Sequence, residues 1–376
     1  MHLNLRAIPA PEWERLFHRR QGWIGSDCAY TVPLSQQRIL WLFGDTYWGE
    51  VRDGERVNAT LVMGNSIAIQ QGKHPQSAHI EFLFGKPREG KPTAFLAPRT
   101  AKGWFWFGHG IAEGKHLWLF LTHIVPTGEP GVFGFRSEAV WLAEVHDCSL
   151  HPSRWCVDLH RLPFYQRTAN TLIAFGSAVW SDGRWTYIYG TRDDRTHTPL
   201  KRGLLIARAP AGRLSHFTRW QFWCDGKWSS AWRDSAPAGE DIGAEFSVSF
   251  VPTLRRWVLV YSPATLAPEI RVRWAQSPTG AWSEPHAVYR CPDVQVGRHV
   301  FCYAAKAHPE LSAEGELLVT YATNSFEWSE VLRDARLYVP RFIRLQYFTT
   351  QGNRIPNHYA SSSTTSWCPR TSGTVT

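Results

Sequence analysis

The sequence predicts an all-β protein, a five-bladed β-propeller, and two observations lead to this prediction. The 376-residue chain contains 20 Trp, 20 Phe and 12 Tyr but only two Met, a composition that favours strands and aromatic-lined sites over helical bundles. One pattern of apolar strands also recurs five times, and repetition at a regular period is typical of propellers and other repeat architectures.

The clearest part of each repeat is an apolar strand that ends in an aromatic residue. A strand rich in small residues precedes it, and small residues suit strands that crowd around a common axis. The aromatic ends are Phe43, Phe120, Tyr189, Tyr261 and Tyr321, and the preceding strands are expected at residues 25–30, 107–110, 175–178, 244–248 and 302–306. A β-sandwich is the alternative, but sandwiches do not need such a period.

A third strand follows in every unit, at residues 65–70, 139–144, 203–208, 270–274 and 341–345. Four units also contain a fourth strand, at residues 80–84, 156–159, 220–223 and 287–289. The fifth unit lacks one, and residues 3–8 can supply it, so that no sheet edge stays exposed. We therefore expect one propeller domain over residues 1–345 and a disordered tail over residues 346–376.

Charge and cysteine usage restrict the expected partners. The net charge is +9, but no run of four Lys or Arg and no basic helix is present, which argues against nucleic-acid binding. No stretch of 18 apolar residues predicts a membrane span. We expect a monomer with reduced thiols, because the seven Cys form no CxxC pair. The N-terminus contains no signal peptide, so the location is open: secreted or periplasmic if the start is truncated, and otherwise cytoplasmic.

Two carboxylates in the first unit are the main catalytic candidates. Asp27 lies in the first strand, and Asp45 directly follows the apolar strand that ends at Phe43. A short hairpin between these strands brings both carboxylates to the same end of the blade. Glycoside hydrolysis needs such a pair, one protonated and one ionised. For each residue alone, a structural role as a turn cap is the alternative.

Further polar and aromatic residues lie on or near the predicted inner strands. Glu245 is the rival acid, and pairing Asp27 with Glu245 is the alternative catalytic arrangement. A carbohydrate substrate is expected to contact some of the others, although hydrogen bonding or packing within the blades explains each equally well. These candidates for substrate binding are Arg56, Asn65, Trp104, Trp106, His109, Ser177, Lys306, His308 and Asn324.

Several other mechanisms lack support in the sequence. No HExxH motif, paired CxxC or tight His/Cys cluster indicates zinc, and no cofactor or metal is expected. Residues 110–115 are one residue short of a phosphate-binding loop. The sequence around Ser177 lacks the second glycine of a nucleophile elbow.

The motifs around these residues resemble propeller families of unknown-function domains related to glycoside hydrolases, a group that includes endo-D-arabinanases. The resemblance runs from Trp23 to Leu345 and is most specific around Asp27 and Asp45. It implies a retaining glycoside hydrolase that cleaves an arabinan-like furanoside, with Asp45 as nucleophile and Asp27 as acid/base. A carbohydrate-binding propeller without catalytic activity is the alternative function.

Overall fold

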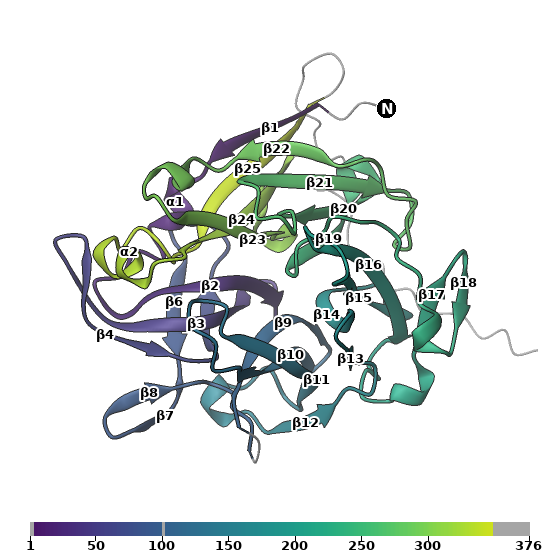
Figure 1. Cartoon of the computed structure of the whole chain (residues 1–376), viewed down its shortest axis with the longest axis horizontal. Helices are drawn as coiled ribbons and strands as arrows, with labels where there is room; N and C mark the ends of the chain where they lie inside the picture. Colours follow the sequence, from purple (N-terminus) through teal and green to yellow (C-terminus); the bar gives the residue numbers. More distant parts are fainter. Residues whose placement is uncertain (1–3, 100–101, 349–376) are drawn as a thin grey trace, which may run out of the picture.

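The computed structural model describes residues 4–99 and 102–348 and confirms the five-bladed β-propeller. Five antiparallel sheets are arranged around a common centre, in chain order (Figure 1). All four predicted outer strands form where they were expected, because each apolar segment ends at a turn that reverses the chain.

Each blade contains four main strands, which follow one another from the centre outward. Blade 1 comprises β2 (Gln21–Pro33), β3 (Arg38–Arg52), β5 (Ser66–Gln71) and β6 (His79–Leu83). Blade 2 comprises β9 (Trp104–Glu113), β10 (His116–Pro126), β11 (Phe135–Val145) and β12 (Val157–Arg161). Blade 3 comprises β14 (Thr171–Ser181), β15 (Trp185–Asp194), β16 (Lys201–Pro210) and β17 (Gln221–Cys224). Blade 4 comprises β19 (Phe246–Val251), β20 (Arg256–Tyr261), β21 (Glu269–Ala275) and β22 (His286–Arg290).

The fifth blade combines the two ends of the described chain. It contains β23 (Val300–Ala307), β24 (Glu316–Ser325), β25 (Arg341–Phe348) and, outermost, β1 (Asn4–Pro9). β1 pairs antiparallel with β25 over its whole length, from Asn4 opposite Phe348 to Pro9 opposite Ile343. The N-terminal segment therefore occupies the edge that the fifth repeat leaves open. β25 continues to Phe348, beyond the expected domain end at Leu345, and residues 349–376 lie outside the described residues.

Additional elements decorate this plan. β4 (Glu55–Val62) pairs with the far half of β3, and β7 (Gly85–Arg88) pairs with β8 (Lys91–Thr93). β13 (Gln166–Arg167) and β18 (Lys227–Ser229) extend blade 3 to six strands. There are two short helices in the described residues. α1 (Pro11–Glu14) follows β1, and α2 (Trp328–Arg333) lies between β24 and β25 in the sequence. The short 3-10 helices span Pro152–Arg154, Phe217–Arg219, Trp232–Asp234, Pro252–Leu254, Pro292–Gln295 and Pro309–Leu311.

The core lies between neighbouring blades, so the fold contains several cores instead of one. Separate clusters of buried apolar residues join blades 1 and 2, 2 and 3, 3 and 4, and 4 and 5. A further cluster closes the ring between blades 5 and 1. There, Phe17 is fully buried, with its ring 5.3 Å from Phe342 and 5.0 Å from Trp41. Burial of such large rings contributes about 2 to 3 kcal/mol each to stability.

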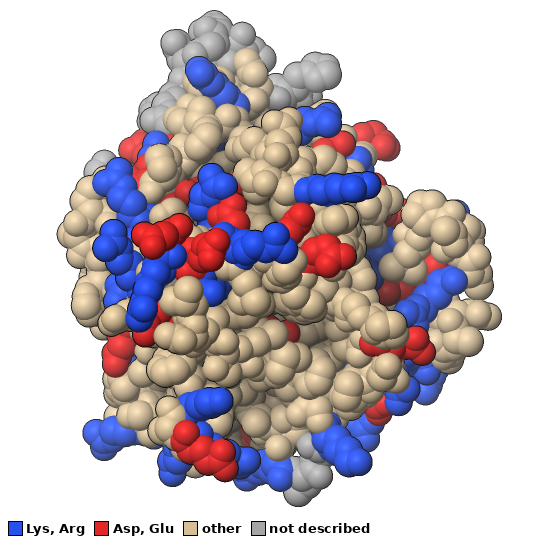
Figure 2. All heavy atoms as spheres, turned by 60° about the vertical axis from the view of Figure 1, so that its left-hand side comes forward, with Lys and Arg blue, Asp and Glu red and all other residues tan. Residues whose placement is uncertain are grey.

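Charges of both signs share one face of the molecule. On the face shown in Figure 2, Lys and Arg are interspersed with Asp and Glu, and uncharged residues surround a hollow near the centre. The six cysteines within the described residues are all unpaired thiols. Across residues 4–99 and 102–348, the helices are too short to cross a membrane.

Candidate active site

The inner strands surround the central axis, and four of them bulge at the level of the candidate residues. The inner strands contact one another in the order β2, β9, β14, β19 and β23, and β23 returns to β2. Pairing is interrupted in β2, β9, β14 and β23. Each interruption leaves one or two residues of the inner strand without a partner on the next strand, as a β-bulge does. At these bulges the alternation of side chains along the strand is broken. The affected residues are Asp27, His109, Ser177 and the two residues before Lys306.

Asp27 lies in the bulge of β2, and the backbone around it is strained. The next two residues, Cys28 and Ala29, adopt positive φ angles of 72° and 58°, which is uncommon for residues other than glycine and is concentrated at functional sites. The hydroxyl of Tyr303 donates a hydrogen bond of 2.6 Å to Asp27 Oδ2. Burial, together with the negative charges of Glu245 and Asp45, raises the pKa of Asp27 to about 7. This carboxyl group therefore stays largely protonated up to about pH 6 and loses its proton as pH rises through about 7.

Asp45 has a different environment on the adjacent strand. Asp45 lies in the short part of β3 between two pairings. The strand pairs with β5 as far as Phe43 and with β4 from Thr46 onward. The Oδ1 atom of Asp45 accepts hydrogen bonds from the Gly64 backbone N–H (2.5 Å) and from Trp106 Nε1 (2.8 Å). Burial raises the pKa of Asp45 to about 6, and these two hydrogen bonds act in the opposite direction. The pKa of Asp45 is therefore raised less than that of Asp27. The two hydrogen bonds also fix the position of its Oδ1 atom.

Buried hydroxyl groups hold the two strands together behind the aspartates. Ser26 Oγ donates to the Asp45 carbonyl at 2.7 Å, and Thr46 Oγ1 lies 2.8 Å from Ser66 Oγ. All three hydroxyl residues are fully buried. Because buried polar groups are costly to leave unpaired, this network fixes the backbone that carries both carboxylates.

Glu245 and Lys306 form an ion pair between the neighbouring blades 4 and 5. Lys306 Nζ lies 2.7 Å from Glu245 Oε2, and it also donates to the carbonyls of Cys28 (2.5 Å) and Ala304 (2.9 Å). Lys306 is buried, whereas Glu245 precedes β19 and is only partly buried. This arrangement favours Glu245 as a charge that raises the pKa of Asp27 over a role as proton donor.

Aromatic side chains form a continuous path from one aspartate to the other. Trp106, which binds Asp45, contacts Phe135 with ring centroids 4.5 Å apart, and Phe133 follows at 6.3 Å. Phe133 reaches Phe301 of blade 5 at 6.4 Å, and Phe301 lies 5.4 Å from Tyr303, which binds Asp27. The Phe133 side chain is 57% exposed. Phe133, in the loop between β10 and β11, therefore meets blade 5 on the path between the two aspartates, and its side chain is exposed to solvent.

The two candidate histidines are fixed within the protein. His109 Nδ1 accepts from the Val179 N–H at 2.9 Å, so its Nε2 donates to the Thr31 carbonyl at 3.0 Å. Burial lowers the pKa of His109 to about 4, which keeps the ring neutral. His308 is fully buried between the hydroxyls of Thr31 (2.6 Å) and Thr320 (2.7 Å). Both rings join strands of different blades, and neither retains a nitrogen for a sugar hydroxyl.

Arg56 and Asn65 also have structural partners. The guanidinium of Arg56 donates to the backbone carbonyls of Ile24, Val331, Asp334, Ala335 and Leu337. All five N–H donors are used to hold α2 and the following loop against blade 1. Asn65 is fully buried and bonds to Leu96 N, Leu96 O and Phe105 O. These contacts argue against the predicted contacts of Arg56 and Asn65 with substrate.

The remaining candidates occupy different positions around the site. Trp104 is half-buried, and its ring lies 6.2 Å from that of Trp106. Ser177 lies in the bulge of β14 and is half-buried. Asn324 is buried beside Tyr303, and its Oδ1 accepts from the Ser325 N–H. Contacts of these three residues with substrate stay predictions.

Sequence reasoning missed Tyr303, Gly44 and the Phe133 segment. Tyr303 immediately precedes the Ala-Ala-Lys motif and looked like one aromatic among many. Gly44 matters because a side chain there would overlap the Asp27 carboxylate. The Gly-Asp pair at residues 44 and 45, after an apolar strand, was the available signal. A separate cluster of His116, Glu144 and His146 could hold a metal ion, and it comes from strand pairing that no short motif encodes.

Fold and site together define a five-bladed propeller whose first blade carries two aspartates, the half-buried Asp27 and the buried Asp45. The chain belongs to the family described as a domain of unknown function, DUF5005, whose model matches residues 11–348. It is 28% identical over 335 residues to notoamide biosynthesis cluster protein J′ of Aspergillus versicolor, covering 81% of this chain and 82% of that protein.

One solved structure shows the likeness in fold, and a second is more distant. A Bacteroides ovatus protein that has been suggested to be a hydrolase superimposes with a TM-score of 0.71, at 17% identity, over 91% of this chain and 90% of its own. An α-L-arabinofuranosidase from Clostridium thermocellum gives a TM-score of 0.49 at 10% identity, over 93% of this chain and 98% of that one. At 17% identity, the likeness to the Bacteroides ovatus protein shows a shared fold and nothing about activity.

Proposed function

We propose that this protein hydrolyses a glycosidic bond, with Asp27 as the proton donor and Asp45 as the ionised carboxylate. The observation that carries the proposal is the difference in hydrogen bonding: Tyr303 donates one bond to Asp27, whereas Gly64 and Trp106 both donate to one oxygen of Asp45. Both have raised pKa values, about 7 for Asp27 and about 6 for Asp45. Raised pKa values suit carboxyl groups that exchange protons near neutral pH, which is what glycoside hydrolysis requires.

The hydrogen bonds support these roles. Asp45 Oδ1 accepts two hydrogen bonds, which leaves Oδ2 to attack the anomeric carbon. As the bond to the leaving oxygen breaks, Asp27 transfers its proton to that oxygen. Water then cleaves the glycosyl ester on Asp45, and Asp27 takes up the proton released from this water. This is the retaining sequence, in which the donor ends in its starting state.

The aromatic path supports a substrate that presents ring faces. Sugar rings stack on aromatic side chains, and aglycones with apolar groups do so more strongly. We propose a furanoside as the sugar, either in an arabinan-like glycan or in a small glycoside. The small glycoside enters the proposal because a relative is named for a fungal biosynthesis cluster, and the exposed Phe133 suits an apolar aglycone.

The experiment measures hydrolysis by the wild type, Asp27→Asn and Asp45→Asn on arabinan, aryl furanosides and aryl pyranosides. Asp53→Asn is the matched control, because Asp53 is an exposed turn residue with a positive φ that Asn tolerates. We expect losses of at least about 100-fold in both site variants and none in the control.

Two further measurements separate the proposed roles. Azide should restore turnover of Asp45→Ala, because the small anion attacks the anomeric carbon in place of the carboxylate. Calorimetric titration with the same glycans tests the alternative function. Binding without turnover by the wild type would identify a carbohydrate-binding propeller and overturn the hydrolase proposal.

A further inference from the structure

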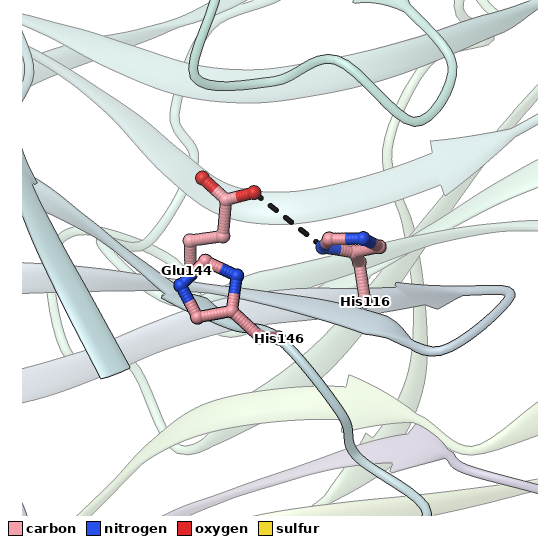
Figure 3. Close-up of side chains that lie close together, drawn as sticks. All are labelled: His116, Glu144 and His146. Atoms are coloured by element: carbon pink, nitrogen blue, oxygen red, sulfur yellow. Dashed lines mark ion pairs between the residues drawn. The ribbon is translucent and has the colours of Figure 1, made fainter. Parts of the chain in front are cut away.

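Two histidines and a glutamate converge at one end of blade 2 (Figure 3). His116 begins β10, Glu144 lies near the end of β11, and His146 directly follows that strand. One ligand atom from each residue lies within 4.8 Å of those of the other two. His116 Nδ1 is 3.5 Å from Glu144 Oε1. The group is separate from the carboxylates of the candidate active site.

Strand pairing explains why these three side chains meet. Residues 144 and 146 are two apart, so their side chains lie on the same face of the extended chain. In the β10–β11 ladder, Leu117 pairs with Val145 and Trp118 pairs with Glu144. The same register places His116 opposite His146. The His116 ring also stacks on Trp118, with ring centroids 5.5 Å apart, which restricts its orientation.

A second layer of side chains from β12 surrounds the group. Asp158 Oδ2 lies 2.8 Å from His146 Nε2. A carboxylate on the far nitrogen of an imidazole is the usual outer partner of a metal-binding histidine. His160 Nε2 lies 3.3 Å from the second oxygen of Glu144, Oε2. That nitrogen is buried and has no hydrogen-bond partner within the described residues.

We propose that His116, Glu144 and His146 form a binding site for Zn²⁺. Imidazole nitrogens with one carboxylate are a typical zinc ligand set, whereas Ca²⁺ and Mg²⁺ prefer oxygen ligands alone. Ligands about 2.1 Å from a tetrahedral ion lie about 3.4 Å from one another. The 3.5 Å between His116 Nδ1 and Glu144 Oε1 already fits this spacing. Because Asp158 engages Nε2 of His146, Nδ1 of that ring is the ligand.

The position of the site indicates a structural role for the ion. Trp106, which binds Asp45, pairs with Thr122 toward the far end of β10. His116 begins that strand, six residues earlier, which corresponds to about 20 Å along an extended chain. The ion therefore joins the start of β10 to the end of β11 and holds their spacing at the end of the blade remote from the aspartates.

The test is a titration of tag-free, chelator-treated protein with Zn²⁺ in competition with a chromophoric chelator. We expect one equivalent to bind, and Co²⁺ to give the visible absorption of a tetrahedral site. Affinity should fall at least about 100-fold in His116→Ala, His146→Ala and Glu144→Gln, and about tenfold or more in Asp158→Asn. Zn²⁺ should raise the Tm of the wild type but not of the three ligand variants.

His197→Ala is the matched control. His197 is exposed to a similar degree as His146 and lies 3.2 Å from Asp194, but it belongs to no ligand group of three within the described residues. Its loss should leave Zn²⁺ affinity unchanged. Glu144→Gln preserves the shape of the side chain, so it reports on the ligand even if an alanine variant unfolds. No stoichiometric binding by the wild type, or equal binding by all ligand variants, would overturn the proposal.

Discussion

The carboxylate of Asp27 lies directly against Gly44, in the space that a side chain at position 44 would occupy. A Cβ atom there would overlap Asp27 Oδ1 and would also contact its Cγ. The glycine that precedes Asp45 therefore sets the position of the other aspartate. The backbone at Gly44 does not need a positive φ, so the requirement is one of space alone.

Gly44→Ala should displace the Asp27 carboxylate and reduce kcat at least about 100-fold, since small displacements of reacting groups cost about that much. Folding should be retained, because the obstructed atoms belong to a side chain. Circular dichroism and kcat on the best glycoside substrate would measure the two effects. Gly239→Ala is the control, because a Cβ there meets only ordinary contacts at 3.9 Å. Full activity in Gly44→Ala would disprove this positioning role.

The dependence of kcat/KM on pH should be bell-shaped. Activity should fall as pH drops through about 6, where Asp45 takes up a proton, and as pH rises through about 7, where Asp27 loses its proton. Glu245→Gln removes a charge that raises the pKa of Asp27, so it should move the basic limb to lower pH. Tyr303→Phe removes a hydrogen bond that lowers this pKa and should move the same limb to higher pH. Shifts in the same direction for both variants would contradict the assignment.

The free energy of unfolding should also depend on Asp27. Its pKa is higher in the folded chain (about 7) than the ordinary value of 3.8. The stabilisation from its bound proton is therefore complete below about pH 4 and is lost as pH rises through 7. At pH 8, Asp27→Asn should melt a few degrees above the wild type, and the difference should shrink toward pH 5. A melting curve at each pH measures this, and a lower Tm for the variant at pH 8 would refute it.

Arg56 should matter for stability. Replacing it with Ala leaves five backbone carbonyls of blade 1 and the α2 segment without their donors. We expect the free energy of unfolding to fall by about 2 to 4 kcal/mol. Arg52→Ala is the control, because that side chain is 64% exposed and pairs only with Glu50. Denaturant titration measures both, and an unchanged midpoint for Arg56→Ala would argue against the structural role.

Phe133 should contribute to substrate binding. Its exposed ring lies between Phe135 and Phe301 on the path that joins the two aspartates. Phe133→Ala should raise KM about 3- to 10-fold with little change in kcat, because one ring contact is worth about 0.5–1.5 kcal/mol. Val296→Ala, at another exposed apolar position, should leave both constants unchanged. A loss confined to kcat would instead place Phe133 in the chemical step.

The blades were predictable from sequence because each depends on local patterns: an apolar run, a turn and a reversal. Asp27 and Asp45 were predictable as a pair because one hairpin joins their strands. Their partners were not, since the bond from Tyr303 to Asp27 spans 276 residues. The roles of His308 and Arg56 were also hidden, because a polar residue reads the same in sequence whether it binds a sugar or a neighbouring blade.

The pairing of β1 with β25 determines when, during synthesis of the chain, the ring of blades can close. Both aspartates are made early, but Glu245, Tyr303 and Lys306 follow at least 200 residues later, and the last strand of the ring pairs with the first. A nascent chain that lacks the fifth blade carries Asp27 without the groups that tune its proton. The full set of contacts around Asp27 therefore forms only when synthesis has passed residue 340 and the ring has closed.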